Sequence, residues 1–369
     1  MSPRFSQPPV RAAVASWPAP AAARVAAAAV FLAALALLLL AAAPGAHAAI
    51  KGVEKGVSFT GYWNDSYVGS APHTSLRHLR ATGADWAMIL VTVYQDDAES
   101  TTISRTEPNT PTDASLTAII AYAHKLGLKV MLKPQLDLLN DPSHWRGQIG
   151  LDFSGDQWAA WFASYDEQIV HYATLAAATG CEQFSVGCEL DSSVGHAAAW
   201  RQVIADVRGV YRGKLTYADD EITTDPGAVS FWDAVDLIGQ DAYPTLSTHL
   251  HPTVAQLEAG WSRYDRLLLR LHRRVGKPVI FTEIGIRSIA GAARAPWDWQ
   301  VSGKIDLTGQ ARWYQAALAT FAPRDWLQGM FWWQWAPDPT VGGRHDGSYT
   351  PYGKPAGVVL HTWYAHRLQ

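Results

Sequence analysis

The sequence predicts an α/β protein, a single (β/α)8 barrel that follows an N-terminal signal peptide. Eight short runs rich in β-branched and aromatic residues alternate with longer stretches of helical period along the chain. Several of the short runs, such as AMILVTV and VIFTEIG, are apolar almost throughout, which is typical of parallel strands covered on both faces. An open doubly wound sheet would usually carry a glycine-rich turn after its first strand, and here that turn reads GYWND.

Residues 1–49 differ in kind from the rest of the chain. Three arginines precede an Ala/Leu stretch from about Val25 to Ala43, and the small-residue sequence Ala46–Ala48 follows. This order is typical of a secretory signal peptide, although the apolar stretch is also long enough to serve as an uncleaved membrane anchor. We therefore expect an exported protein, secreted or periplasmic or held by its N-terminal segment, in which residues 50–369 form the barrel domain.

The elements of the barrel follow one another in a regular order. Amphipathic stretches predict outer helices, among them Ser115–Leu126, Gln157–Ala177, Ala197–Tyr211 and Val254–Arg274, which are commonly closed by glycine. The predicted strands are Val57–Tyr62, Trp86–Tyr94, Lys129–Leu136, Gln183–Leu190, Lys214–Ala218, Leu237–Tyr243, Pro278–Gly285 and Gly329–Trp335.

The charge and the cysteines limit the function classes. The formal net charge is only −3 and the barrel contains no basic run, so a nucleic-acid partner is not expected and a neutral substrate fits better. Cys181 and Cys188 bracket one predicted strand, which would hold them roughly 20 Å apart at about 3.3 Å per residue. A disulfide needs about 4.4–6.8 Å between its Cα atoms, so we expect two free, mostly buried thiols.

Two glutamates end apolar strands that lie opposite each other in an eight-stranded barrel. Glu189 closes FSVGCEL on the fourth strand, and Glu283 lies in VIFTEIG on the seventh. Barrel active sites form at the C-terminal ends of the strands, so both carboxylates are expected to face one cleft. Paired buried glutamates that only hold loops together are the alternative. Glycosidic cleavage needs two such groups, and a separation of about 5–5.5 Å would give retention of configuration.

Aromatic residues supply a second signal, because flat rings match the apolar faces of sugars. The chain has seventeen tryptophans, and those on helical stretches are expected in the core. His249 and His251 form an HxH pair in a predicted loop without further histidines, so no metal site is predicted. The candidates for substrate contacts are Trp63, Gln135, Asp137, Arg146, Asp219, Tyr243, Trp297, Trp332, Trp333 and Trp335.

An ordered set of segments resembles glycoside hydrolase family 113 from about Val57 to Tyr364. It comprises MLKPQLDL, WRGQI, WAAWFASYDEQIVHYA, FSVGCEL, LTYADD, FWDAVDLIGQDAYPTL, GKPVIFTEIGIRS, APWDW, GMFWWQW and YGKPAGVVLHTWY. The resemblance implies a retaining β-1,4-mannanase fold and activity, with Glu189 as general acid/base and Glu283 as nucleophile. It also implies that Tyr243 donates a hydrogen bond to the nucleophile and that aromatic residues within Trp332–Trp335 form the floor of a sugar subsite.

The chain departs from the wider pattern in ways that bear on specificity. Cys188 stands where related barrel glycosidases usually have asparagine before the acid/base, Gln135 stands where histidine is common, and the fifth strand ends in an unusually acidic Asp219–Glu221. These changes leave the catalytic pair intact.

The hypothesis that best fits the sequence is a cofactor-free, monomeric enzyme that hydrolyses β-1,4-mannan or a related β-linked polysaccharide or oligosaccharide by double displacement. Two alternatives stay open. One is a glycosidase or transglycosylase that acts on a glucan or a glycoconjugate, and the other is a non-catalytic glycan-binding protein on the same scaffold. The sequence does not decide between endo and exo action.

Overall fold

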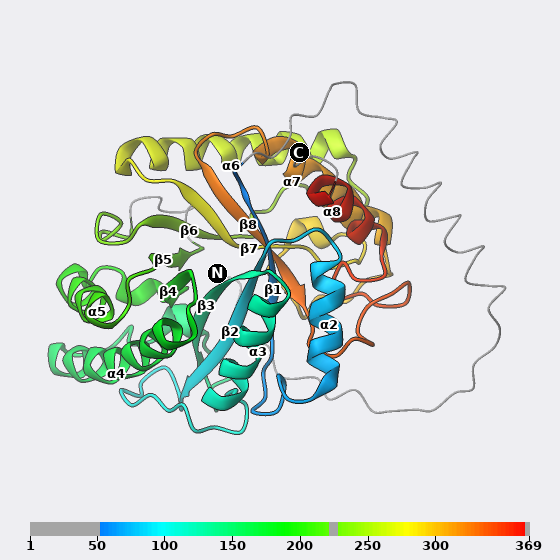
Figure 1. Ribbon diagram of the computed structural model, residues 1–369. Helices are drawn as coiled ribbons and strands as arrows, with labels where there is room; N and C mark the ends of the chain where they lie inside the picture. The colour runs from blue at the N-terminus through cyan, green and yellow to red at the C-terminus, as the bar shows by residue number, and fades with distance from the viewer. Residues whose placement is uncertain (1–51, 221–227, 366–369) are drawn as a thin grey trace.

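The computed structural model describes residues 52–220 and 228–365, and its strands close into one parallel barrel in sequence order (Figure 1). Closure is made by β1 and β8, which pair in parallel from Glu54 opposite Gly329 onwards. The predicted (β/α)8 barrel is therefore confirmed. The strands are β1 (Glu54–Phe59), β2 (Trp86–Gln95), β3 (Lys129–Leu138), β4 (Gln183–Cys188), β5 (Lys214–Asp219), β6 (Leu237–Ala242), β7 (Val279–Ile284) and β8 (Leu327–Trp335).

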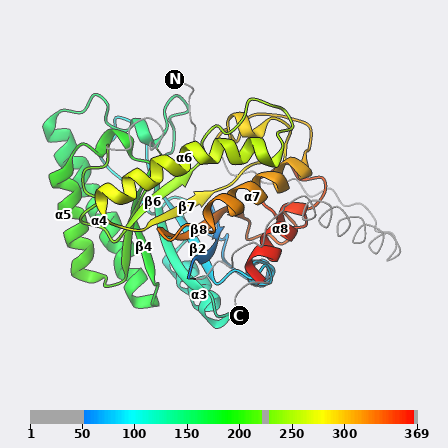
Figure 2. The ribbon, with the colours of Figure 1, turned by 90° about the horizontal axis from the view of Figure 1, so that it is seen from above.

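The helices lie around the outside of the barrel (Figure 1), and Figure 2 shows α6 and α7 along one flank. Within the described residues an α-helix follows each strand except β5, and residues 221–227, between β5 and β6, lie outside the described residues. No helix of the described residues is long and apolar enough to cross a membrane. The α-helices are α2 (Ser70–Arg80), α3 (Asp113–Lys125), α4 (Gly155–Thr179), α5 (Ala197–Val210), α6 (Val254–Val275), α7 (Leu307–Phe321) and α8 (Pro355–Ala365).

Local sequence explains where the two longest helices begin and end. Ser154 and Thr253 cap α4 and α6, and in each case the glutamine three residues later bonds back to the capping residue. Both helices end at a glycine in the left-handed region, Gly180 with φ 74° and Gly276 with φ 76°. The predicted start of α6 at Val254 is confirmed, and the other predicted bounds of these two helices differ from the observed ones by one or two residues. The predicted signal peptide at residues 1–49 lies outside the described residues.

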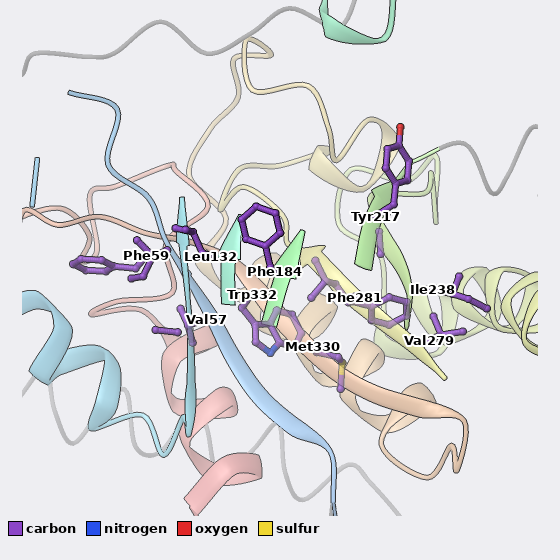
Figure 3. Close-up of a cluster of buried hydrophobic side chains, with 14 of the residues drawn as sticks. Val57, Phe59, Leu132, Phe184, Tyr217, Ile238, Val279, Phe281, Met330 and Trp332 are labelled. Atoms are coloured by element: carbon purple, nitrogen blue, oxygen red, sulfur yellow. The ribbon is translucent and has the colours of Figure 1, made fainter. Parts of the chain in front are cut away.

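Two apolar layers pack against the sheet, one on each face. Alternate residues of β2 show the division: Ala87, Ile89 and Val91 face the helices, whereas Met88 and Leu90 face the barrel interior. Figure 3 shows part of the outer layer, including Trp332. The inner layer lies inside the barrel and includes Trp86, Met88, Leu90, Met131, Leu237, Ile280 and Phe331. Buried polar side chains lie beyond this layer at both ends of the barrel, with Glu54 and Gln183 at the N-terminal ends of the strands and Asp241 and Glu283 towards the C-terminal ends.

Two local features shape that end of the barrel. A Cβ atom at Gly285 would lie 2.3 Å from the carbonyl oxygen of Trp333, so only glycine lets the chain after β7 approach β8 this closely. Glu189 is the only described non-glycine residue with positive φ, at 53°. A side chain held in this sparsely populated conformation is placed by its surroundings rather than by backbone preference.

The prediction of two free thiols is confirmed: Cys181 and Cys188 form no disulfide, and both are buried.

Candidate active site

A cavity of about 390 Å³ opens at the C-terminal ends of the strands. It gathers side chains from seven strands or the turns that directly follow them, together with residues of three longer loops and of α6. Of the residues predicted to form the site, the cavity is lined by Gln135, Asp137, Arg146, Glu189, Tyr243, Glu283, Trp297 and Trp333. The predicted catalytic glutamates therefore share one cavity, as the barrel topology requires.

Glu283 is held from both of its carboxylate oxygens. It lies on β7 with 5% of its surface exposed. The ammonium of Lys133 donates to Oε1 at 2.6 Å, and the hydroxyl of Tyr243 donates to Oε2 at 2.8 Å. Charged hydrogen bonds of this kind fix a carboxylate in one orientation. Tyr243 thus occupies the position that the family resemblance implies.

Lys133 bridges two buried carboxylates inside the barrel. Its side chain has no exposed surface, and its ammonium also donates to Asp241 at 2.9 and 3.1 Å. Asp241 is fixed further by the hydroxyl of Thr282 at 2.7 Å. Burial acts to lower the pKa of Lys133, but the charges of Asp241 and Glu283 outweigh it and hold that pKa well above its usual value. Lys133 is therefore a permanent positive charge beside Glu283.

The surroundings of Glu283 shift its pKa in opposing directions. Burial raises the pKa of Glu283 to about 8, and the charge of Asp241 acts in the same direction. Lys133 opposes this rise through its charge and its hydrogen bond. One ammonium serves two buried carboxylates, so the pair holds a proton more tightly than an exposed glutamate does.

Glu189 occupies a different environment across the cavity. It follows β4, where its backbone N–H donates to the carbonyl of Ala218 at 2.8 Å. The Arg146 guanidinium donates to its carboxylate at 2.6 Å and also to Asp137 at 3.2 Å. Arg146 comes from the short 3-10 helix η1 (Arg146–Gln148), which follows β3. One of the two predicted catalytic glutamates is therefore paired with a buried lysine, and the other with a loop arginine.

Aromatic residues form the walls of the cavity. Trp333 projects from β8 with 6% of its surface exposed. The loop after β7 contributes Trp297 and Trp299. Arg287 anchors that loop by donating to the backbone carbonyl of Trp299 at 2.7 Å. Tyr349 from the loop after β8 donates to the Pro296 carbonyl at 2.7 Å. Trp145 and Tyr62 complete this set. Rings fixed in this way present flat apolar faces suited to sugars.

Two tryptophans of β8 do not line the cavity, which corrects the prediction made for them. Trp332 is completely buried, stacks on Tyr314 with ring centroids 3.9 Å apart and donates to Tyr364 at 2.9 Å, all in the outer layer. Trp335 is buried in the same layer and donates to Ser75 at 3.0 Å.

A bulge explains why Trp335 does not share the face of Trp333. Pairing with β1 steps from Val57 opposite Trp332 to Phe59 opposite Trp335, so β8 contains one extra residue at this point. An extra residue reverses the alternation of faces beyond it. Trp333 alone of the three predicted tryptophans on β8 lies in the inner layer.

Two further predicted contacts lie outside the lining of the cavity. Asp219 is buried in the last position of β5, opposite Gln240, whose amide donates to it at 3.0 Å. Its neighbour Asp220 lines the cavity instead. Trp63 is half-buried in the turn after β1, where its backbone N–H donates to the Ser66 hydroxyl at 2.9 Å, and the adjacent Tyr62 reaches the cavity.

The prediction missed several residues that the cavity brings together. Asp241 lines the cavity, and Lys133 binds it from outside the lining; both are polar residues buried within strands, a position that is costly without a partner. No sequence signal joined them, because they lie on β3 and β6. The other lining residues absent from the prediction are Tyr62, Trp145, Asp220, Pro244, Thr245, Gly260, Arg263, Tyr264, Leu267, Asp298, Trp299, Gln300 and Tyr349.

One group of side chains has the composition of a metal site. Ligand atoms of Cys188, Glu189 and Asp241 lie within 4.8 Å of one another. The group fits a cation poorly, since the Lys133 ammonium already binds Asp241 and burial raises the pKa of the Cys188 thiol, which donates to Asp241 at 3.5 Å. A protonated thiol is not a metal ligand.

The geometry suits one kind of chemistry especially well. Two carboxyl groups in distinct electrostatic settings face a shared cavity with aromatic walls. Glycosidic cleavage requires a proton donor and a second carboxylate placed in this way, and the sugar requires flat surfaces to lie against.

Comparison with known proteins agrees with this geometry. The model of the family described as Glycoside Hydrolase Family 113 matches residues 57–354. A solved GH113 β-1,4-mannanase complex is 31% identical with a TM-score of 0.75, and the match covers 85% of this chain and 99% of that one. The GH113 β-mannanase AaManA from Alicyclobacillus acidocaldarius, solved in complex with ManMIm, is 32% identical with a TM-score of 0.74, covering 87% and 100%.

More distant structures share the fold alone, and a Ruminococcus gnavus β-glucuronidase is 13% identical with a TM-score of 0.55, covering 83% of this chain and 50% of that one. Among curated proteins, none matches. The extent of the family match, together with the placement of both glutamates, leads to one conclusion: this chain belongs to glycoside hydrolase family 113.

Proposed function

We propose that this protein is a retaining endo-β-1,4-mannanase in which Glu189 is the general acid/base and Glu283 the nucleophile. The observation that carries the proposal is the meeting of these two glutamates in one aromatic cavity of a family 113 barrel. The similarity to solved β-1,4-mannanases of the same family supports β-mannan as the substrate.

In the first half of the proposed reaction, Glu189 gives its proton to the glycosidic oxygen while Glu283 attacks the anomeric carbon. The bond from that carbon to the leaving oxygen breaks, and a glycosyl ester of Glu283 forms. The Lys133 and Tyr243 donors hold Glu283 at 2.6 and 2.8 Å, which orients its carboxylate for attack.

In the second half, water attacks the anomeric carbon of the ester. Glu189, now ionised, accepts the proton from water, and the electron pair of the ester bond returns to Glu283. Both proton transfer and covalent capture come from side chains, so the proposed reaction uses no metal or organic cofactor.

Product release from a panel of polymers tests the substrate class. The parent protein should release oligosaccharides from soluble mannan or glucomannan, and much less from xylan or mixed-linkage glucan. Glu283→Ala should lose activity by roughly 10³-fold or more. Glu167→Ala, an exposed glutamate on α4, serves as the matched control and should remain fully active. Release from glucan instead of mannan would change the substrate, and binding without release from any polymer would indicate a glycan-binding protein.

The stereochemistry of the first product tests the retaining mechanism. Proton NMR during hydrolysis of a mannooligosaccharide should show the β-anomer first, before mutarotation produces the α-anomer. Initial appearance of the α-anomer would mean inversion, and Glu283 would then activate water rather than attack the sugar.

We also propose that the protein is an exported monomer whose N-terminal segment directs it out of the cytoplasm. Cell fractionation with N-terminal sequencing of the recovered protein tests export and cleavage, and light scattering of the purified protein tests the oligomeric state. Recovery in the cytoplasmic fraction, or a dimer mass, would contradict the respective part.

A further inference from the structure

Lys354 is a buried lysine that does not line the cavity, at the end of the loop that runs from β8 to α8. Its side chain has no exposed surface. The ammonium donates to the Asp346 carboxylate at 2.9 Å, to the Ser288 hydroxyl at 2.9 Å and to the Ser348 backbone carbonyl at 3.0 Å. Burial lowers the pKa of Lys354, and the charge of Asp346 opposes that change. Three donated bonds use all three hydrogens of an ammonium, so each of them has an acceptor.

These contacts join two loops that are far apart in the sequence. Ser288 belongs to the loop after β7, whereas Asp346 and Ser348 belong to the loop after β8. The backbone N–H of Ser288 donates to the Ser348 carbonyl at 3.2 Å, and its hydroxyl donates to the Asp346 carbonyl at 2.8 Å. Ser288 is completely buried. Lys354 therefore completes a buried junction that holds the two loops together.

The junction lies next to Tyr349, a residue of the cavity wall that directly follows Ser348. The hydroxyl of Tyr349 donates to the backbone carbonyl of Pro296 at 2.7 Å, one residue before Trp297. Its own backbone carbonyl accepts a bond of 2.8 Å from the buried side chain of Gln310 on α7. Tyr349 thus connects the junction to the loop that carries the tryptophans.

Tyr349 also packs against the tyrosine that binds the proposed nucleophile. The rings of Tyr349 and Tyr243 meet edge to face, with centroids 6.4 Å apart and an angle of 77° between their planes. The hydroxyl of Tyr243 in turn donates to Glu283 at 2.8 Å. A shift of Tyr349 would therefore disturb one cavity wall and the packing of Tyr243 together. Misplacement of such groups by about 1 Å can cost roughly 10²-fold in rate.

We propose that Lys354 is a positioning residue for the reaction, which fixes Tyr349 and, through it, the aromatic wall and the contact between Tyr243 and Glu283. Its three hydrogen bonds all go to the two loops, so Lys354 acts through Tyr349 rather than on the substrate. The inference rests on the proposed function, because it concerns the rate of mannan hydrolysis.

Lys354→Met removes the ammonium and keeps an unbranched side chain. Its kcat/KM on mannohexaose, measured well below its melting temperature, should fall roughly tenfold or more. Labelling with 2-deoxy-2-fluoro-β-mannosyl fluoride, which leaves a slowly hydrolysed ester on the nucleophile, counts the active sites. Rates are expressed per labelled site, so a loss of folded protein is not read as a loss of rate. Lys304→Met, an exposed lysine in the loop after β7, is the matched control and should keep the parent rate.

Two further variants distinguish positioning from a structural effect. In a Tyr349→Ala background, Lys354→Met should lower kcat/KM by less than roughly threefold more, because the residue through which it acts has been removed. Ser288→Ala removes the hydroxyl that joins the loops but leaves the Lys354–Asp346 pair intact, so this variant should fold. It should lower kcat/KM roughly threefold or more per labelled site.

An unchanged rate per labelled site in Lys354→Met would overturn the inference. A loss that is just as large in the Tyr349→Ala background would also overturn it, since Lys354 would then act by another route. If Lys354→Met gives no labelled protein, a parent rate in Ser288→Ala would have the same consequence. A parent protein inactive on mannohexaose would overturn the proposed function, and this inference with it.

Discussion

The ammonium of Lys133 lies 2.6 Å from a carboxylate oxygen of Glu283, in the interior of a closed barrel. The same ammonium binds Asp241, so two buried carboxyl groups depend on one cation. Removing one partner of a buried ion cluster leaves charge without compensation, which is far more costly than losing an exposed pair.

Lys133→Met should therefore lower the free energy of unfolding by about 3–5 kcal/mol and abolish activity. Urea denaturation monitored by tryptophan fluorescence gives the first quantity. Lys125→Met, an exposed lysine at the end of α3, is the control and should change stability little. A fully stable Lys133→Met protein would show that Asp241 and Glu283 do not carry their charges in the resting fold.

The raised pKa of Glu283 predicts how stability depends on pH. The folded-state pKa is about 8 and the ordinary value is 4.5, so the folded protein binds this proton more tightly than the unfolded chain does. The stabilisation from Glu283 is present below pH 4.5 and is lost as the pH rises towards 8. Glu283→Gln, which has no such proton, should gain in melting temperature relative to the parent between pH 5 and about 8. A constant difference across that range would contradict the raised pKa.

Tyr243→Phe should lower kcat/KM roughly 10- to 150-fold without unfolding the protein. The lost contact is the 2.8 Å bond to Glu283, and a hydrogen bond to a charged group contributes about 1.5–3 kcal/mol. Steady-state kinetics on mannohexaose, with circular dichroism as the control for folding, measure the effect. Unchanged kinetics would mean that Lys133 alone orients the nucleophile.

The neighbouring tryptophans of β8 should respond in opposite ways to substitution. Trp332→Ala should cost about 3–5 kcal/mol of stability, since this residue is fully buried between the sheet and α7. Trp333→Ala should lower kcat/KM through loss of a cavity wall, with a smaller effect on stability. Thermal unfolding and kinetics of the two variants form a matched pair. Equal kinetic losses in both would contradict the assigned faces.

Neither cysteine should react with a thiol reagent in the folded protein. Both side chains are buried, and burial raises the pKa of each thiol. The pKa of Cys181 rises to about 12. Titration with a chromogenic disulfide should detect two thiols after denaturation and none before it. Rapid reaction in the native state would indicate that the strand containing Cys188 opens.

The barrel could be predicted from the sequence because each strand carries its own signal. Runs such as AMILVTV are apolar on both faces, and this pattern requires no knowledge of distant residues. The two glutamates could be placed for a similar reason, because the ends of parallel strands in a closed barrel meet at one face. The Lys133–Asp241 pair could not, since nothing local links β3 to β6.

The strand-eight tryptophans show a second limit. Strict alternation would put Trp333 and Trp335 on one face, and the extra residue in β8 breaks that rule. A bulge depends on how β8 fits against β1, at the other end of the chain. Loop contributions such as Trp145 and Trp299 were likewise set by tertiary contacts rather than by the pattern of the strands.

The closed order of the barrel divides the proposed catalytic pair between the two halves of the chain. A cut between α5 and β5 would leave Glu189 with β1–β4 and Glu283 with β5–β8. Neither fragment would contain a complete site, so hydrolysis by a mixture of the two would occur only where complementary fragments had reassembled. Hydrolysis by the mixture would then measure whether the two half-barrels had paired.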